Sequence, residues 1–162
     1  MREKIIRESI ESLRREGLRF SVDLLASRLK ISKKTVYKYF PNKEALALAM
    51  YEAYYAEVTE AAERLAAEPS LSAKKELLRL YFDSKMMTRR EIFNKYQLNE
   101  TVFSDTSARN TALWNLLSGS LRLRCPERDA EAVRVIVDGS FEKLCDSRQD
   151  PDAVIERLVE LL

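Results

Sequence analysis

The strongest local constraint on this chain lies in residues 31–46, which read ISKKTVYKYFPNKEAL. Ser32 is well suited to cap a helix, because its hydroxyl accepts a hydrogen bond from a free amide of the first turn. Val36 and Phe40 fall on one helical face, and Pro41 ends the helix because its ring favours an extended residue before it. Two apolar residues cannot stabilise so short a helix alone, so we predict that it packs on neighbouring helices.

The other side chains of this segment carry positive charge or hydrogen-bonding groups. Asn42 is placed to cap a second helix, with Glu44 in its first turn. Lysines, phenols and hydroxyls together suit phosphate oxygens and base edges better than a protein core. We therefore predict a DNA-binding surface formed by Ser32, Lys33, Lys34, Thr35, Tyr37, Lys38, Tyr39, Asn42 and Lys43.

The distribution of charge supports a polyanionic partner for the N-terminal part. The net charge is +2, but residues 1–43 hold twelve Lys and Arg against five Asp and Glu. Residues 44–162 hold sixteen basic and twenty-one acidic residues. A basic segment on a slightly acidic remainder indicates a polyanion as the partner of that segment only. The alternative is a lysine-rich surface that contacts only solvent.

The sequence pattern predicts an all-α protein. Only three glycines and four prolines occur, and alternating strand-like runs are missing. Gly17 is expected in the left-handed conformation that ends the first helix. We expect helices over 3–16, 22–29, 33–40, 42–67, 72–88, about 92–96, 110–121, 127–147 and 150–162, with caps at Asn99, Asp105 and Thr106 in a less regular region. The small core of the first three is predicted to contain Ile6, Ile10, Leu13, Leu18, Phe20, Leu25, Leu29, Ile31, Val36 and Phe40.

Residues 31–46 resemble the DNA-reading helix of TetR-family transcriptional regulators, whose pattern runs roughly VSKGTLYxHFxSKExL. The positions that match in identity or character are Ile31, Ser32, Lys33, Thr35, Val36, Tyr37, Phe40, Lys43, Glu44 and Leu46. Lys30 stands where the family usually has a turn glycine, and Lys34 stands where a second glycine is common. The resemblance extends back through residues 20–26, which read FSVDLLA.

The resemblance implies a helix-turn-helix DNA-binding domain over residues 1–45 and a helical ligand-binding and dimerisation domain over 46–162. It also implies a repressor that a small molecule releases from double-stranded operator DNA. Thr35, Tyr37 and Lys43 are expected on phosphates, partly because the following helix N-terminus attracts anions. Lys34, Lys38 and Tyr39 are expected at base edges.

The resemblance further implies an effector pocket and a homodimer. An apolar or aromatic effector would suit a pocket formed by Tyr81, Phe82, Met86, Phe93, Tyr96, Phe103, Trp114 and Leu117. Plain core packing is the alternative for this set. The dimer is expected to form through the last two helices, at Val133, Ile136, Val137, Ser140, Phe141, Leu144, Ile155, Leu158, Val159 and Leu162. An ordinary intrachain core is the alternative there.

Residue types that are missing exclude several functions. No histidine occurs, which removes the commonest general base and a common metal ligand. Cys125 and Cys145 are not in a redox or metal-binding spacing and fit structural thiols. No glycine-rich phosphate loop and no apolar run of about 18 residues occurs. We therefore expect no enzymatic activity, cofactor, metal or membrane partner, and the charged N-terminus predicts a cytoplasmic protein.

Two alternative functions stay open at the level of sequence. A protein of the same fold could bind another protein as a coactivator or division-type regulator. A small helical-bundle enzyme would need a metal site or catalytic pair, and the sequence displays neither.

Overall fold

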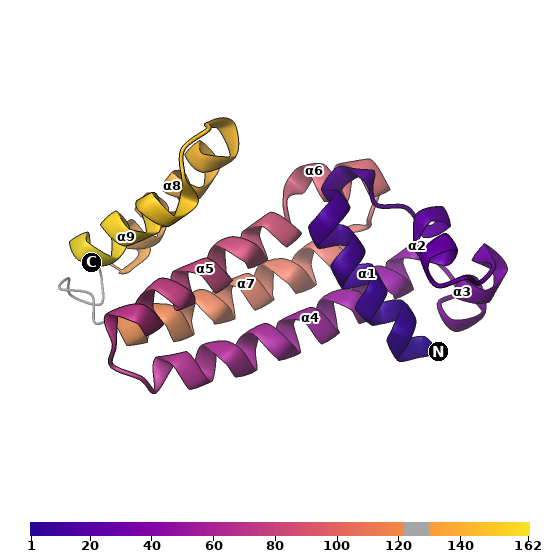
Figure 1. Ribbon diagram of the computed structural model, residues 1–162, viewed down its shortest axis with the longest axis horizontal. Helices are drawn as coiled ribbons and strands as arrows, with labels where there is room; N and C mark the ends of the chain where they lie inside the picture. Colours follow the sequence, from indigo (N-terminus) through magenta and orange to yellow (C-terminus); the bar gives the residue numbers. More distant parts are fainter. Residues whose placement is uncertain (122–129) are drawn as a thin grey trace. The chain divides into compact units, whose positions relative to one another are not determined.

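The computed structural model describes residues 1–121 and 130–162, and its regular structure is helical throughout these ranges (Figure 1). The helices are α1 (Arg2–Glu16), η1 (Gly17–Arg19), α2 (Val22–Arg28), α3 (Lys33–Tyr39), α4 (Lys43–Ala66), α5 (Leu71–Met87), α6 (Arg90–Tyr96), α7 (Glu100–Leu121), α8 (Ala130–Asp146) and α9 (Pro151–Leu161). No strand occurs in the described ranges, and the predicted all-α class is confirmed. The predicted start of a helix at Glu127 and the thiol of Cys125 lie outside the described residues.

The chain divides into two compact units. Unit 1 consists of Met1–Val58 and Lys85–Arg109, and unit 2 consists of Thr59–Ser84 and Asn110–Leu162. Helices α4, α5 and α7 each begin in one unit and end in the other. The predicted boundary between a DNA-binding domain ending at residue 45 and a regulatory domain beginning at residue 46 concerns function, and it stays a prediction.

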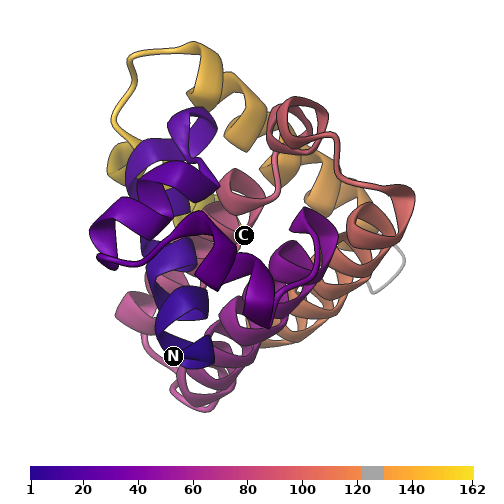
Figure 2. The same cartoon turned by 90° about the vertical axis from the view of Figure 1, so that its right-hand side faces the viewer.

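In unit 1 the first three helices, drawn in indigo and violet in Figure 2, share a small apolar core. Ile5, Leu25 and Val36 are fully buried, and Phe40 is nearly so. The inclusion of Leu18 in this core was wrong, because Leu18 is 43% exposed. It lies in the three-residue turn η1, whose tighter winding directs this side chain to solvent.

The turn between α2 and α3 has a defined hydrogen-bonding pattern. The amide of Ile31 donates to the carbonyl of Ala26 at 3.0 Å, and the amide of Lys30 donates to the carbonyl of Ser27 at 3.1 Å. These two bonds form a Schellman motif, which requires a left-handed residue after the helix. Lys30 has a φ of 54° and supplies that conformation at the position where the resembling family usually has glycine. The turn therefore keeps its geometry without glycine.

Helix α7 is longer than the pattern indicated, because it begins at Glu100 and not near Asn110. The side chain of Asn99 caps it by accepting from the amide of Val102 at 3.1 Å. Asp105 and Thr106 were also expected as caps, and both of these predictions were wrong. Inside the helix, Thr106 donates to the carbonyl of Val102 and Asp105 binds Arg109.

In unit 2 an aromatic core joins α5, α7 and α8. The rings of Tyr81 and Trp114 have centroids 5.3 Å apart, and those of Phe82 and Phe141 are 5.5 Å apart. The Tyr81 hydroxyl donates to Asp138 Oδ1 at 2.8 Å, which supplies a partner for a polar group in this core. Asp150 caps α9 by accepting from the amide of Asp152, as the sequence predicted.

Two searches of the described residues concern other classes of site. No helix among them is long and apolar enough to cross a membrane. Across residues 1–121 and 130–162, no three Asp, Glu, Cys or His side chains gather in an arrangement that could hold a metal ion.

Candidate nucleic-acid interface

Helix α3 is fixed by its two ends and by one buried face. The Ser32 hydroxyl accepts from the amide of Thr35 at 3.0 Å, which satisfies one amide of the first turn. Val36 and Phe40 point into the core of unit 1, and the guanidinium of Arg2, an exposed residue, lies 5.3 Å from the Phe40 ring centroid. The rest of the helix is therefore held outward without contributing to the core.

The three lysines of α3 differ in their surroundings. Lys33 Nζ lies 3.0 Å from Asp23 Oδ2 on α2, and this contact raises the pKa of Lys33. Lys34 and Lys38 are exposed and take part in no ion pair among the residues that the structure describes. These two are the α3 lysines whose charge is available to a polyanion.

The side chains expected on phosphates lie around the end of α3 and the start of α4. Tyr37 is 37% exposed, and Lys43 is half-buried with its Nζ 3.9 Å from Glu44 Oε1. The Thr35 hydroxyl is bonded to that of Ser32 at 2.9 Å. Asn42 caps α4 by accepting from the amide of Ala45 at 2.8 Å. Ser32 and Asn42 therefore use their oxygen atoms within the chain, while Tyr37 and Lys43 each keep part of their side chain exposed.

The exposed surface of α3 can bind an anionic duplex. An open depression on it is lined by Ser32, Lys34, Thr35, Tyr37 and Lys38. Tyr39 is 41% exposed at the end of the helix. Ammonium and hydroxyl donors of this kind bind phosphate oxygens and the acceptors of base edges.

The eight residues expected around an effector are divided between the two units. Tyr81, Phe82, Trp114 and Leu117 are buried in the core of unit 2. In unit 1, Phe93 packs edge-on against Phe103 with centroids 5.6 Å apart, and Tyr96 is half-buried. Met86 is 45% exposed, so its inclusion in an apolar lining is not supported by its burial. The effector pocket formed by these eight residues stays a prediction.

The ten residues expected at a dimer interface also separate into groups. The buried ones are Val133, Val137, Phe141, Ile155, Leu158 and Val159, and the interface of these ten residues stays a prediction. Ser140, Leu144 and Leu162 are half-buried, and Ile136 is 59% exposed. Val135 beside it is 67% exposed, although the helical pattern did not single it out. A shallow groove on the α8–α9 hairpin runs along Ile136, Gly139, Ser140, Lys143, Leu144 and Val154.

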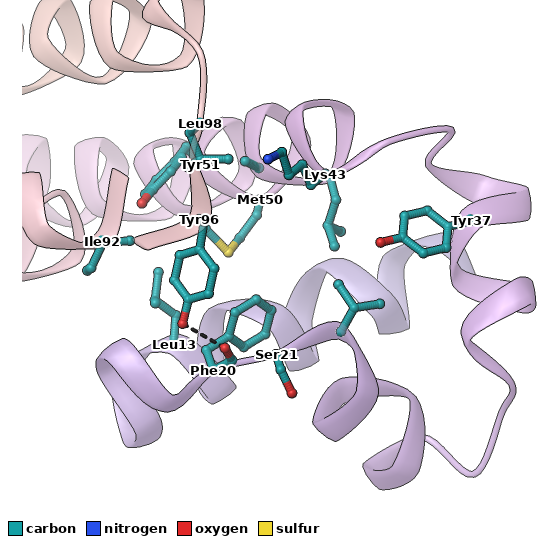
Figure 3. A pocket seen from close by; sticks show the side chains of 13 residues that line it. Leu13, Phe20, Ser21, Tyr37, Lys43, Met50, Tyr51, Ile92, Tyr96 and Leu98 are labelled. Atoms are coloured by element: carbon teal, nitrogen blue, oxygen red, sulfur yellow. Dashed lines mark hydrogen bonds between the residues drawn. The ribbon is translucent and has the colours of Figure 1, made fainter. Parts of the chain in front are cut away.

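A cavity in unit 1 was not predicted from the sequence. It has a volume of about 170 Å³, and α1, α4, α6 and the segment leading into α2 surround it (Figure 3). Tyr96 of α6 closes one side, where its hydroxyl donates to the carbonyl of Phe20 at 2.6 Å. Tyr37 and Lys43 also line it. No spacing in the sequence could indicate it, because Tyr96 and Phe20 are brought together by tertiary packing.

Comparison with known proteins gives the family of the N-terminal part. Residues 5–50 match the family model described as bacterial regulatory proteins, tetR family. No curated protein is significantly similar in sequence.

Two solved structures share the fold. The crystal structure of a TetR-family transcriptional regulator from Bordetella parapertussis 12822 is similar with a TM-score of 0.64 at 22% identity, covering 99% of this chain and 92% of that one. The crystal structure of Mycobacterium smegmatis AmtR is similar with a TM-score of 0.53 at 19% identity, covering 99% of this chain and 84% of that one.

These findings confirm the resemblance that residues 31–46 displayed, because the segment lies wholly within the matched range. At these levels of identity the two solved structures establish similarity of fold. Residues 5–50 are therefore similar to the tetR family of bacterial regulatory proteins, and the fold of the chain is similar to that of a solved TetR-family transcriptional regulator.

Proposed function

We propose that this chain is a transcriptional repressor that binds operator DNA through the exposed surface of α3. The observation that carries the proposal is the basic helix itself, held outward by buried Val36 and Phe40 within the segment that matches the family. Because bacterial operators lie in the cytoplasm, the protein would act there.

The surroundings of the side chains suggest which of them contact bases and which contact phosphates. Lys34 and Lys38 lack intrachain ion pairs in the described residues, so their ammonium groups can reach guanine acceptors in a major groove. Tyr37 and Lys43, at the junction with α4, would bind phosphates and fix the orientation of α3. Lys33 contributes less, because Asp23 already neutralises it.

We propose that the protein acts as a homodimer through the exposed side of α8. Val135 and Ile136 are large apolar side chains with more than half of their surface exposed, and they lie beside the groove that Gly139 lines. A Cβ atom added at Gly139 would meet no atom within 4 Å in the chain, so intrachain packing does not require glycine there. Close approach of a second helix would explain why a residue that weakens the helix stands at this position.

A two-fold dimer would present two copies of α3 to one face of the duplex. The operator would then be palindromic, with half-sites about 34–36 Å apart or somewhat more. We further propose that a small apolar or aromatic effector lowers the affinity for this operator. An effector changes the equilibrium only by its differential affinity for the DNA-binding arrangement, and a 100-fold loss corresponds to about 2.7 kcal/mol.

The experiment is a titration of fluorescent DNA from the region upstream of the protein's own gene, at several salt concentrations. Lys34→Ala is expected to weaken binding and to reduce the preference for that DNA over unrelated DNA. Lys43→Ala is expected to weaken both DNAs equally and to lower the slope of log affinity against log salt by about one. Lys74→Ala, the same change on α5 in unit 2, is the control and should leave both quantities unchanged.

The titration also separates DNA binding from a protein-binding role. A coactivator of this fold would bind neither the upstream DNA nor the unrelated DNA. Circular dichroism of the α3 variants checks that they fold as the wild type does. Unchanged DNA affinity in both Lys34→Ala and Lys43→Ala would overturn the assignment of α3.

A further inference from the structure

The cavity in unit 1 has the size of a single-ring molecule. Its volume is about 170 Å³, and an apolar protein cavity of about 150 Å³ is large enough to hold benzene. The cavity is partly open to solvent, and Tyr37 and Lys43 are among the residues that line it (Figure 3). It is therefore a pocket that a small ligand can enter without unfolding the core.

The walls of the cavity are apolar and come from separate helices. Leu13 of α1, Met50 of α4, Ile92 of α6 and Leu98 after α6 contribute side chains without charge. A planar ring would remove these side chains from water, and each square ångström of apolar area buried is worth about 25 cal/mol. Such a lining selects an apolar ring.

The polar groups at the edge of the cavity are donors. Lys43 is the charged residue of the lining, and no Asp or Glu belongs to it. The Tyr37 hydroxyl points into the cavity in Figure 3, and no hydrogen bond is recorded for it within the described residues. Glu44 lies outside the lining, and its contact with Lys43 is loose, at 3.9 Å. A cation and a hydroxyl donor in the lining of an otherwise apolar pocket complement a carboxylate.

The position of the wall on the α6 side is fixed by Tyr96. Its hydroxyl donates to the carbonyl of Phe20 at 2.6 Å, and the two rings pack edge to face with centroids 5.9 Å apart. Burial raises the pKa of Tyr96, so this hydroxyl stays protonated and keeps donating at neutral pH. The pocket is thus formed before any ligand arrives.

We propose that this cavity binds a small aromatic carboxylic acid, with the ring among the apolar side chains and the carboxylate on Lys43 and Tyr37. The consequence for DNA rests on the proposed function, in which these two side chains contact phosphates. A bound carboxylate would occupy the same donors, so ligand and DNA would compete directly within unit 1. No motion between the units is needed for this effect.

The binding test uses the full chain without DNA and follows the methyl signals of its methionines by NMR during titration. The probes are benzoate, toluene as its uncharged analogue and benzylamine as its cationic analogue. Benzoate is expected to shift the Met50 signal with saturation, and toluene and benzylamine are expected to bind at least tenfold more weakly. Equal affinity for benzoate and toluene would overturn the role of Lys43.

Variants locate the site. Ala47→Leu adds side-chain volume to the lining and should weaken benzoate binding at least tenfold, while Ala56→Leu makes the same change on the exposed side of α4 and should not. Leu98→Phe adds side-chain volume at another residue of the lining and serves if Ala47→Leu fails to fold. Lys43→Met should reduce benzoate affinity to that of toluene. Saturable binding that both filling variants leave unchanged would show that benzoate binds elsewhere, which would overturn the proposal.

A final comparison separates this inference from the proposed function. Saturating benzoate should lower the DNA affinity of the wild type about tenfold and that of Ala47→Leu not at all. If the protein fails to bind DNA, the NMR titration still decides whether the cavity binds an acid. If benzoate binds in the cavity and DNA affinity does not change, the competition is refuted while the binding site stands.

Discussion

At the scale of the residue, Lys30 shows how a local conformation can survive an unfavourable side chain. It adopts a φ of 54° in the turn before α3, where the Schellman hydrogen bonds require a left-handed residue. A side chain with a Cβ atom costs about 1–2 kcal/mol in that conformation, whereas glycine adopts it freely. We expect Lys30→Gly to raise the free energy of unfolding by about 0.5–1 kcal/mol, partly offset by the greater freedom of glycine in the unfolded chain. Urea denaturation of the wild type and the variant measures this difference in the free energy of unfolding.

The control for Lys30→Gly is the same substitution at Lys38, inside α3. Glycine in a helix interior costs about 1 kcal/mol, so Lys38→Gly should destabilise the protein. Gln97 ends α6 with a φ of 49° and a matching pair of hydrogen bonds, and Gln97→Gly should therefore stabilise it. A loss of stability in Lys30→Gly would mean that residue 30 is not left-handed in solution.

At the scale of the element, a substitution of the glycine inside α8 should affect the stability of the helix and its association with a second chain in opposite directions. Gly139 and Gly119, which lies within α7, both have open space where a Cβ atom would stand. Each change to alanine should therefore stabilise its own helix by up to about 1 kcal/mol. If a second chain packs over α8, Gly139→Ala should nevertheless weaken dimerisation, because the added methyl group keeps the two helices apart. Sedimentation equilibrium measures the dimer, and thermal unfolding measures stability.

Gly119→Ala is the matched control, since it should raise stability and leave the dimer constant unchanged. Ile136→Asp tests the same face without a change in backbone freedom, because this exposed side chain has no role in the intrachain core. Phe141 is unsuitable for such a test, because it packs on Phe82 and its loss would disturb the fold itself. Wild-type dimerisation in both Gly139→Ala and Ile136→Asp would place the interface elsewhere.

At the scale of the whole molecule, buried tyrosines in both units make stability sensitive to alkali. Burial raises the pKa of Tyr51 and of Tyr81, so the folded protein holds these protons where the unfolded chain, with an ordinary pKa of about 10, releases them. Below pH 10 both states are protonated and the effect is constant. As the pH rises above 10, the free energy of unfolding should fall, by at most about 1.4 kcal/mol per pH unit for each tyrosine.

Tyr51→Phe isolates one of these contributions. The variant loses the hydrogen bond from the Tyr51 hydroxyl to the carbonyl of Met87, so we expect a loss of about 1 kcal/mol at pH 7. Its stability should then fall less steeply above pH 10 than that of the wild type. Tyr39→Phe, on an exposed ring, is the control. Urea denaturation at pH 8–11 gives the slopes, and equal slopes for Tyr51→Phe and the wild type would contradict the prediction.

The sequence predicts well those features of the whole molecule that depend on neighbouring residues. Ser32, Asn42 and Asp150 were expected as caps, and each accepts a hydrogen bond from an amide of its helix. The outward face of α3 followed from the spacing of Val36 and Phe40 alone.

Features that depend on tertiary packing were not predictable in this way. The packing of α5 and α9 against α8 decides which apolar face of α8 is buried. It also decides that Ile136 stays exposed to solvent. The cavity of unit 1 depends on Tyr96 meeting the carbonyl of Phe20 across 76 residues of sequence. Local periodicity carries no information about either.

The contact between Lys33 and Asp23 has a consequence for how tightly this protein can hold a polyanion. Asp23 acts as an internal counterion of Lys33, and unlike a chloride ion it cannot diffuse away when phosphates approach. DNA must compete with it for Lys33, so α3 offers fewer free charges than it has lysines. Asp23→Asn should release that charge, steepen the salt dependence of binding by up to about one unit and tighten binding at low salt. The wild-type chain thus carries its own weak competitor for DNA, built into the helix before the one that would read it.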